Sequence, residues 1–323
     1  MDIGALLVKI VVIMAAVNAL VWIIALYGKV LKNPKLMLQN PRYQEKGQTK
    51  LLSFLHFCFV FFIMFFDTLG IGGNAPHTAL MRLFKATDER LIPGTLNTAS
   101  LVGSATETML FVSTVTVDPI TLVCLILAVT VGTKIGAKFV SHLPLRPIRF
   151  IIGIGLAVVT VTMILRNLGL WVEGGMAIGI YGWQLIVATL LFFVVGVLAA
   201  GGVGGYAFMI AICYGFGMDP RCAFPIMFGS YTFLMLWGGL TFLKNEALDY
   251  RANVFGNIGG VIGVLLAYFI FQSLPINVLF WIIVVVLFYT SATMLYSAIK
   301  NTANAAAATS AEPAAEGGND SAE

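Results

Sequence analysis

The hydrophobic part of this chain consists of two similar halves, and this duplication limits the folds that it can adopt. Four short motifs recur in the second half at a displacement of 131 or 132 residues. They are Gly-Ile-Gly-Gly-Asn at 70–74 with Gly-Val-Gly-Gly-Tyr at 202–206, Pro93 with Pro225, Val-Asp-Pro at 117–119 with Leu-Asp-Tyr at 248–250, and Leu-Pro at 143–144 with Leu-Pro at 274–275. Two apolar repeats that each open with a glycine-broken segment are typical of secondary transporters.

The composition places both halves in a membrane. Hydrophobic residues make up 59% of the chain and charged residues only 11%, whereas a soluble domain is about a quarter charged. One aqueous core cannot bury so much apolar surface, so lipid must act as the solvent. We therefore predict an all-α polytopic membrane protein, with the lipid bilayer as a partner of the fold.

The apolar segments divide the chain into five parts. We expect an N-terminal transmembrane helix at 1–28, a basic cytoplasmic loop at 29–50, a first repeat at 51–170, a second repeat at 184–299 and a disordered cytoplasmic tail at 300–323. The tail consists mainly of Ala, Ser, Gly and acidic residues without apolar periodicity, which is the composition of disordered segments.

The Lys and Arg residues distinguish two topologies. Each glycine cluster has an apolar segment on both sides. The two segments form either one long crossing or a re-entrant hairpin that turns back at the glycines. With two hairpins and a cytoplasmic loop 29–50, sixteen of the nineteen Lys and Arg residues lie inside, whereas two full crossings divide them about evenly. Because positive residues favour the cytoplasmic side, we predict two inverted repeats, each opening with a Gly-broken re-entrant helical hairpin. With the extra N-terminal transmembrane helix this makes seven crossings, with the N-terminus outside and the C-terminus cytoplasmic. The cytoplasmic markers are then Lys85, Ser141 and Glu246, and the outer markers are Asp118, Glu173 and Asp219.

The glycine clusters are candidates for a binding site. Glycine allows a close approach between backbone and ligand, and a broken helix exposes N–H groups at the start of its return arm, where an anion is stabilised. The alternative is that the glycines only allow close helix packing, but two clusters at equivalent positions favour a site. The candidate substrate-binding residues are Gly72, Gly73, Asn74, His77, Thr95, Asn97, Thr98, Gly204, Gly205, Tyr206, Ser230 and Tyr231.

Several of these residues also have a structural interpretation. The hydroxyl and amide groups of segments 93–100 and 225–232 suit an oxyanion, or they bond across helices and to their own carbonyls. A lone histidine such as His77, close to a packed turn, is more often structural than functional.

Two carboxyl groups lie within apolar segments. Asp67 precedes the first glycine cluster by about one helical turn, and Glu107 lies midway along the next helix. Intramembrane carboxylates are costly and usually mark a pathway or a proton relay. We interpret both as candidate proton-coupling residues, with a neutral packing acid as the alternative. The second repeat has Leu198 or Ala199 opposite Asp67, so such a role is asymmetric.

Other classes of function lack their motifs. The chain contains no G-x-x-x-x-G-K-[ST] motif for nucleotide binding, and none of its four cysteines forms a CxxC pair that would suggest a metal or redox site. An intramembrane protease would need a second well-placed aspartate or histidine. We expect no catalytic residue, no cofactor and no metal, with a small anionic substrate and no nucleic acid as partners. A passive anion channel is the alternative to a transporter.

The order of the motifs carries a family resemblance. A broken helix ending in Gly-Ile-Gly-Gly-Asn-x-Pro is followed by Pro-Gly-Thr-x-Asn-Thr, by Val-Asp-Pro and by a glycine-rich helix leading to Leu-Pro, and this arrangement is repeated over residues 51–299. It resembles the sulfite exporter TauE/SafE family of bacterial inner-membrane permeases. The resemblance implies transport of sulfite, an organosulfonate or a short organic acid. By the same resemblance, the N-terminal helix and loop 29–50 lie outside the family core, and Asp67 is not a core family residue.

Overall fold

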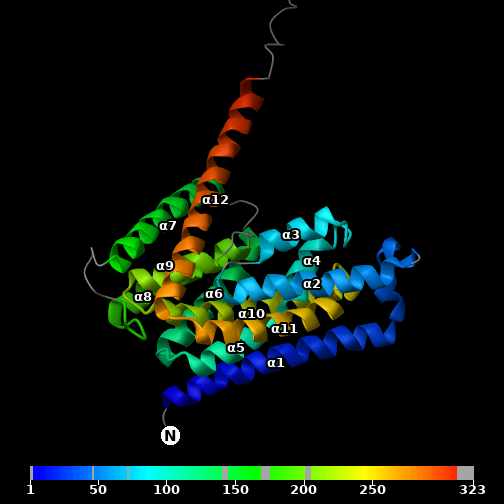
Figure 1. Ribbon diagram of the computed structural model, residues 1–323, viewed down its shortest axis with the longest axis horizontal. Helices are drawn as coiled ribbons and strands as arrows, with labels where there is room; N and C mark the ends of the chain where they lie inside the picture. Colours follow the sequence, from blue (N-terminus) through cyan, green and yellow to red (C-terminus); the bar gives the residue numbers. More distant parts are fainter. Residues whose placement is uncertain are drawn as a thin grey trace, which may run out of the picture.

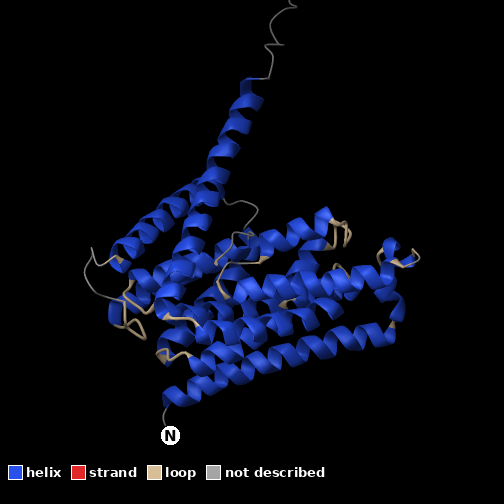
Figure 2. Ribbon diagram, in the orientation of Figure 1, coloured by secondary structure: helices blue, strands red, loops and turns tan. Residues whose placement is uncertain are grey.

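The computed structural model describes residues 3–45, 47–70, 73–139, 145–168, 175–200 and 205–310. Over these residues the chain folds into helices joined by short connections, without a β-strand (Figure 2). The α-helices are α1 (Ile3–Lys32), α2 (Gln48–Thr68), α3 (Asn74–Leu83), α4 (Ile92–Ala99), α5 (Leu101–Thr114), α6 (Pro119–Phe139), α7 (Leu145–Asn167), α8 (Gly182–Ala200), α9 (Tyr206–Gly215), α10 (Ala223–Lys244), α11 (Tyr250–Ser273) and α12 (Ile276–Ser310), and the 3-10 turns are η1 (Pro34–Leu38), η2 (Pro41–Gln44) and η4 (Pro220–Cys222). The all-α prediction is confirmed for this part of the chain.

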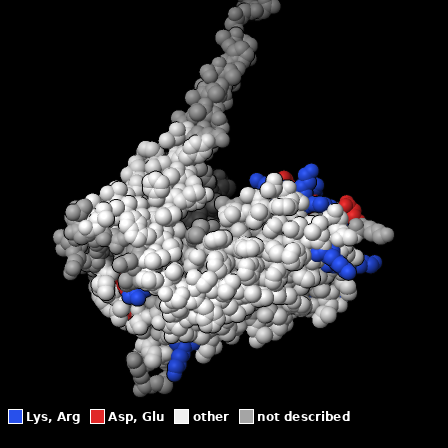
Figure 3. Space-filling view, viewed as in Figure 1, with Lys and Arg blue, Asp and Glu red and all other residues white. Residues whose placement is uncertain are grey.

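Six of the described helices are long and apolar enough to cross a membrane. They are α1, α2, the stretches Pro119–Gly136 of α6 and Gly182–Ala199 of α8, the stretch Pro220–Lys244, and α11. Their outer faces carry large apolar side chains, for example Phe54, Trp183 and Phe269, each more than 60% exposed. Figure 3 shows a broad uncharged surface between the basic side chains at the right-hand end and those at the lower left. Lipid can cover this surface, whereas water would leave it unfavourably solvated.

The helices that open the two halves pack in equivalent ways. Helix α2 lies along α11 (Figure 1), and α8 lies along α6. The opening helix of each half therefore contacts the helix that starts at the recurring Asp118 or Asp249 of the other half. Glycines bring both pairs together. A Cβ at Gly259 or Gly263 of α11 would overlap the backbone of α2, and a Cβ at Gly132 or Gly136 of α6 would overlap the backbone of α8. Small residues four apart allow such a close approach between membrane helices.

The apolar segment at 94–116 forms two helices rather than one. Asn257 of α11 inserts at the junction of α4 and α5: its Oδ1 accepts from the Val102 N–H at 2.9 Å, and its Nδ2 donates to the Thr98 carbonyl at 3.1 Å. These are the two groups that would bond each other in a continuous α-helix. A side chain that replaces such a bond breaks the helix, and the helix axis is interrupted at Ser100.

The segment that follows α3 lies against the segment that precedes α2. Asn40 Nδ2 donates to the Ala86 carbonyl at 3.1 Å, and the Arg42 guanidinium donates to the carbonyls of Phe84 and Lys85. Helix α3 therefore returns toward the end of the molecule at which α2 begins, as Figure 1 also shows.

The same end holds the start of α11. The Tyr43 hydroxyl donates to Asp249 Oδ2 at 2.6 Å, and Asp249 Oδ1 accepts from the Ala252 N–H as the N-cap of α11. Burial and the Asp249 carboxylate raise the pKa of the Tyr43 phenol well above its usual range, so this hydroxyl keeps its proton and remains a donor.

In the second half, the equivalent segments also contact one another, at a separate place in the structure. The Asp219 N–H donates to the Ala177 carbonyl at 2.9 Å, so the residues after α9 lie beside those before α8. Asp118, the residue equivalent to Asp249, donates its N–H to the Ile178 carbonyl and accepts from the Thr121 N–H at the start of α6.

Of the six topology markers, Lys85 and Glu246 lie together near the connector before α2, and Asp118 and Asp219 lie together near the start of α8. Ser141 and Glu173 lie outside the described residues. Helix α12 packs along α7 and then extends beyond the helical bundle to Ser310 (Figure 1). It thus includes the first eleven residues, 300–310, of the segment for which the sequence predicted disorder.

Candidate functional site

Asp67, in the last turn of α2, caps the helix that follows it. The chain turns at Gly70, whose φ of +89° favours glycine. The Gly73 N–H at the start of α3 then donates to Asp67 Oδ1 at 2.8 Å. The carboxylate therefore occupies the N-terminal end of α3, where backbone N–H groups and the helix dipole favour negative charge.

Tyr206 connects Asp67 to the other half of the protein. It is the first residue of α9, and its hydroxyl donates to Asp67 Oδ2 at 2.8 Å. The Tyr206 ring also packs edge-on against Tyr231, with centroids 4.4 Å apart. A single buried carboxylate thus links the starts of α3 and α9, and it lies 139 residues before Tyr206 in the chain.

The start of α9 resembles the start of α3. Gly205 has φ and ψ of −100° and −19°, and Gly73 has −94° and −18°. The Gly205 N–H donates to the Tyr231 hydroxyl at 2.9 Å, where the Gly73 N–H donates to a carboxylate. Both helix N-termini therefore hold a buried oxygen acceptor, which is a carboxyl oxygen in one half and a phenolic hydroxyl in the other. Gly72 and Gly204 lie outside the described residues.

Glu107 of α5 lies at the edge of the same cluster. The Thr68 hydroxyl oxygen is 2.8 Å from Glu107 Oε1 and 2.7 Å from the Met64 carbonyl. A threonine hydroxyl has one hydrogen and cannot donate to both groups. A protonated Glu107 would satisfy both contacts by donating to Thr68, which then donates to Met64. Glu107 Oε2 is buried without a hydrogen-bond partner.

Among the described residues, neither Asp67 nor Glu107 forms an ion pair with a cation. They interact electrostatically, and the ion pairs found among the described residues, Lys29–Glu246 and Arg221–Asp219, lie elsewhere. A second anion could enter this cluster at low cost only if a proton came with it, because like charges repel strongly in a medium of low dielectric constant.

Hydroxyl groups continue the cluster along the interface between α5 and α10. Thr232 Oγ1 is 2.8 Å from Thr108 Oγ1 and 3.2 Å from Ser104 Oγ. Sequence reasoning did not select Thr68 or Ser104 as site residues. Their signal was weak, because hydroxyl residues are common in membrane helices and nothing local shows which neighbour they face.

His77 and Asn74 belong to the first turn of α3. The His77 N–H donates to the Gly73 carbonyl at 3.0 Å, and the imidazole is buried with Nε2 unpartnered. Asn74 is the first residue of α3, and its side chain lies outside the described part of the structure.

The other four candidates have structural partners. The Thr95 hydroxyl accepts from the Asp249 N–H at the start of α11, and Asn97 Nδ2 donates to the Met235 carbonyl at 3.3 Å. Thr98 and Ser230 donate to carbonyls four residues earlier in their own helices. Within the described residues, no group of three His, Cys, Asp or Glu side chains could hold a metal ion.

The comparisons with known proteins agree with the resemblance found in the motifs. A family model described as Sulfite exporter TauE/SafE matches residues 3–163. No curated protein and no solved structure matches the chain. The matched region begins in α1, so the expectation that the N-terminal helix and loop 29–50 lie outside the family core is wrong.

Proposed function

Because this chain belongs to the sulfite exporter TauE/SafE family, we propose that it is a secondary transporter for a small anion such as sulfite, an organosulfonate or a short organic acid. The substrate binds between the N-termini of α3 and α9. The observation that carries this proposal is the arrangement of Gly73 and Gly205, whose N–H groups both point at buried oxygen atoms in one connected cluster.

The packing of the two halves supports an inverted repeat. The exchange of partners, α2 with α11 and α8 with α6, is the pattern that a two-fold axis between the halves would produce. Each short helix after a glycine cluster also returns toward the start of the preceding long helix. Together with the distribution of Lys and Arg, this supports re-entrant hairpins in the bacterial cytoplasmic membrane, with the N-terminus outside and the C-terminus inside.

The Asp67 carboxylate occupies a place that an anionic substrate would take. A sulfite oxygen at the start of α3 would replace Asp67 Oδ1 as the acceptor of the Gly73 N–H, and the Tyr206 hydroxyl, which donates to the other carboxyl oxygen, would be a second donor. Helix N-termini bind oxyanions through such N–H groups. In this mechanism the carboxylate and the substrate compete for the same donors.

Competition of this kind couples a proton to the anion. An ionised Asp67 holds both donors and repels the substrate, whereas a protonated Asp67 accepts weaker hydrogen bonds and carries no charge. Substrate binding is then accompanied by proton uptake, and the two move together or the proton opens access. Glu107, which shares the cluster through Thr68, is a second position that can hold a proton.

The proposal is tested by transport in reconstituted vesicles. Liposomes that contain the purified protein are supplied with sulfite, sulfoacetate or a short carboxylate, with and without a pH gradient. We expect at least one anion to accumulate above its outside concentration when protons are supplied. Flux that only equilibrates the anion would indicate the passive channel instead, and no flux of any of these anions would contradict the proposed function.

A variant pair tests the role of Asp67. Asp67→Asn mimics the protonated side chain, so we expect it to bind the anion but to lose the pH dependence of transport. Asp88→Asn is the matched control, because Asp88 is exposed and lies outside the cluster. A complete pH response in Asp67→Asn would leave Asp67 as a packing residue.

A further inference from the structure

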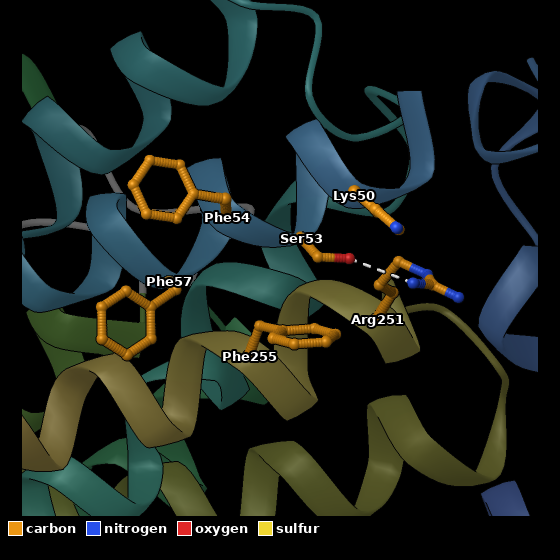
Figure 4. A pocket seen from close by; sticks show the side chains of 6 residues that line it. All are labelled: Lys50, Ser53, Phe54, Phe57, Arg251 and Phe255. Carbon is orange, nitrogen blue, oxygen red and sulfur yellow. Dashed lines mark hydrogen bonds between the residues drawn. The ribbon is translucent and has the colours of Figure 1, made fainter. Parts of the chain in front are cut away.

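A groove of about 480 Å³ lies between the first turns of α2 and α11, separate from the Asp67 cluster. Its lining residues are Lys50, Ser53, Phe54, Phe57, Arg251 and Phe255. We propose that this groove binds an anionic phospholipid, with the phosphate at Lys50 and Arg251 and the acyl chains against the phenylalanines. Figure 4 shows the two cations at one end of the groove and Phe54 and Phe57 toward the other.

The Arg251 guanidinium is held in place but keeps free donors. Its Nε donates to the Met37 carbonyl at 2.9 Å, one terminal nitrogen donates to Ser53 Oγ at 3.0 Å, and its face lies 5.2 Å from the centre of the Tyr43 ring. A guanidinium carries five N–H donors, so these contacts leave several for a ligand. A planar, oriented guanidinium is well suited to phosphate oxygens.

Neither positive charge in the groove is in direct contact with an acid among the described residues. Neither Lys50 nor Arg251 belongs to an ion pair found among the described residues. The carboxylate closest in sequence is Asp249, and its oxygens accept from Tyr43 and from the Ala252 N–H. Two such cations at the end of membrane-crossing helices provide an anion site in the region of lipid headgroups, where basic pockets between helices bind phospholipids.

The apolar half of the groove selects a lipid over a soluble anion. Phe54 is 63% exposed on the outer face of α2, and both α2 and α11 are long and apolar enough to cross a membrane. A free phosphate or sulfite ion gains nothing from aromatic side chains that face lipid. A phospholipid matches both ends, because its headgroup is charged and its chains are apolar.

Lipid binding to the full-length protein in neutral detergent tests the proposal. Native mass spectrometry measures how much phosphatidylglycerol and how much phosphatidylcholine the protein retains. We expect preferential retention of phosphatidylglycerol, weakened about fivefold by Lys50→Gln, since one basic residue near an anionic headgroup contributes roughly that factor. The matched control is Lys32→Gln, because Lys32 is also exposed and ends α1, and it should retain the lipid as the native protein does.

Two further measurements separate a lipid from other ligands. Phe54→Ala should weaken retention of phosphatidylglycerol while inorganic phosphate at millimolar concentration fails to displace the lipid. Equal retention of both lipids, or unchanged retention in Lys50→Gln, would overturn the proposal. Displacement by inorganic phosphate would also overturn it and would assign the two cations to a free anion. Because Lys50 and Phe54 are both exposed, both variants should fold, and their melting temperatures verify this.

Discussion

The hydrogen bond between Tyr206 and Asp67 makes a strong prediction, because it joins the two halves at the proposed site. Tyr206→Phe removes only the hydroxyl that donates to Asp67 Oδ2 at 2.8 Å. The ring keeps its contacts with Tyr231, at a centroid distance of 4.4 Å, and with Phe228, at 5.9 Å. The variant should therefore fold with its packing intact.

The expected loss follows from the charge of the acceptor. A buried hydrogen bond to a charged group contributes about 1.5–3 kcal/mol, and one between neutral groups about 0.5–1.5 kcal/mol. Tyr206→Phe should then lower the melting temperature by roughly 3–6 °C, at about 2 °C per kcal/mol for a chain of this size. In an Asp67→Asn background the loss should be smaller by about 1 kcal/mol, because the acceptor no longer carries charge.

Thermal unfolding of the two single variants and the double variant at pH 8 completes a double-mutant cycle, which isolates the pairwise term. Tyr289→Phe is the control, since Tyr289 is 61% exposed and its hydroxyl should contribute little. Strictly additive losses for Tyr206→Phe and Asp67→Asn would refute the reasoning, because they would show that the hydroxyl and the carboxylate do not interact.

Three other predictions concern the same cluster and its placement in the membrane. Gly73→Ala should slow transport and cost about 1–3 kcal/mol of stability, because its Cβ would overlap Ile63 Cγ2. Transport should recover in the double variant Gly73→Ala/Ile63→Ala. Native activity of the single variant would contradict the close approach between Gly73 and Ile63. Glu107→Gln should melt within about 2 °C of the native protein, because a carboxamide can donate to its threonine partner as a protonated carboxyl does; a large loss in a melting assay would indicate that the carboxylate is charged. In a background without the four native cysteines, a cysteine at Lys85 should be labelled from the cytoplasmic side and one at Asp118 from the other. The reverse labelling, with Lys85 outside and Asp118 inside, would exclude re-entrant hairpins.

Much of the candidate site was predictable from local sequence signals. The glycine clusters marked the ends of α2 and α8, because glycine tolerates the backbone geometry that a helix break requires. Asp67 stood out because a carboxyl group in an apolar segment needs a partner. Gly73, Gly205, Tyr206 and Tyr231 were selected from the same repeat, and the structure brings all four into contact with one another or with Asp67.

The polar segment at 93–100 shows where this reasoning stopped. Its hydroxyl and amide groups suited an anion as well as they suited contacts between helices. In the structure, the Thr95 hydroxyl accepts a hydrogen bond from the Asp249 N–H, and the Asn97 amide donates to the Met235 carbonyl. Which partner a hydroxyl finds depends on the helix that packs beside it, and that helix lies more than a hundred residues away in the chain. The break at Ser100 has the same origin, because it is made by Asn257 from α11.

By itself, the sequence determined the helical membrane fold, the two repeats and the glycine positions at which α2 and α8 end. Hydropathy, glycine content and the spacing of motifs are properties of short segments, and they act on the backbone wherever the segment lies. The tertiary structure alone decided that the Asp67 carboxylate accepts hydrogen bonds from both the start of α3 and the Tyr206 hydroxyl. It also decided that Lys50 and Arg251 line one groove together with three phenylalanines. These contacts join residues far apart in the chain, so they exist only once packing has set which helix faces which.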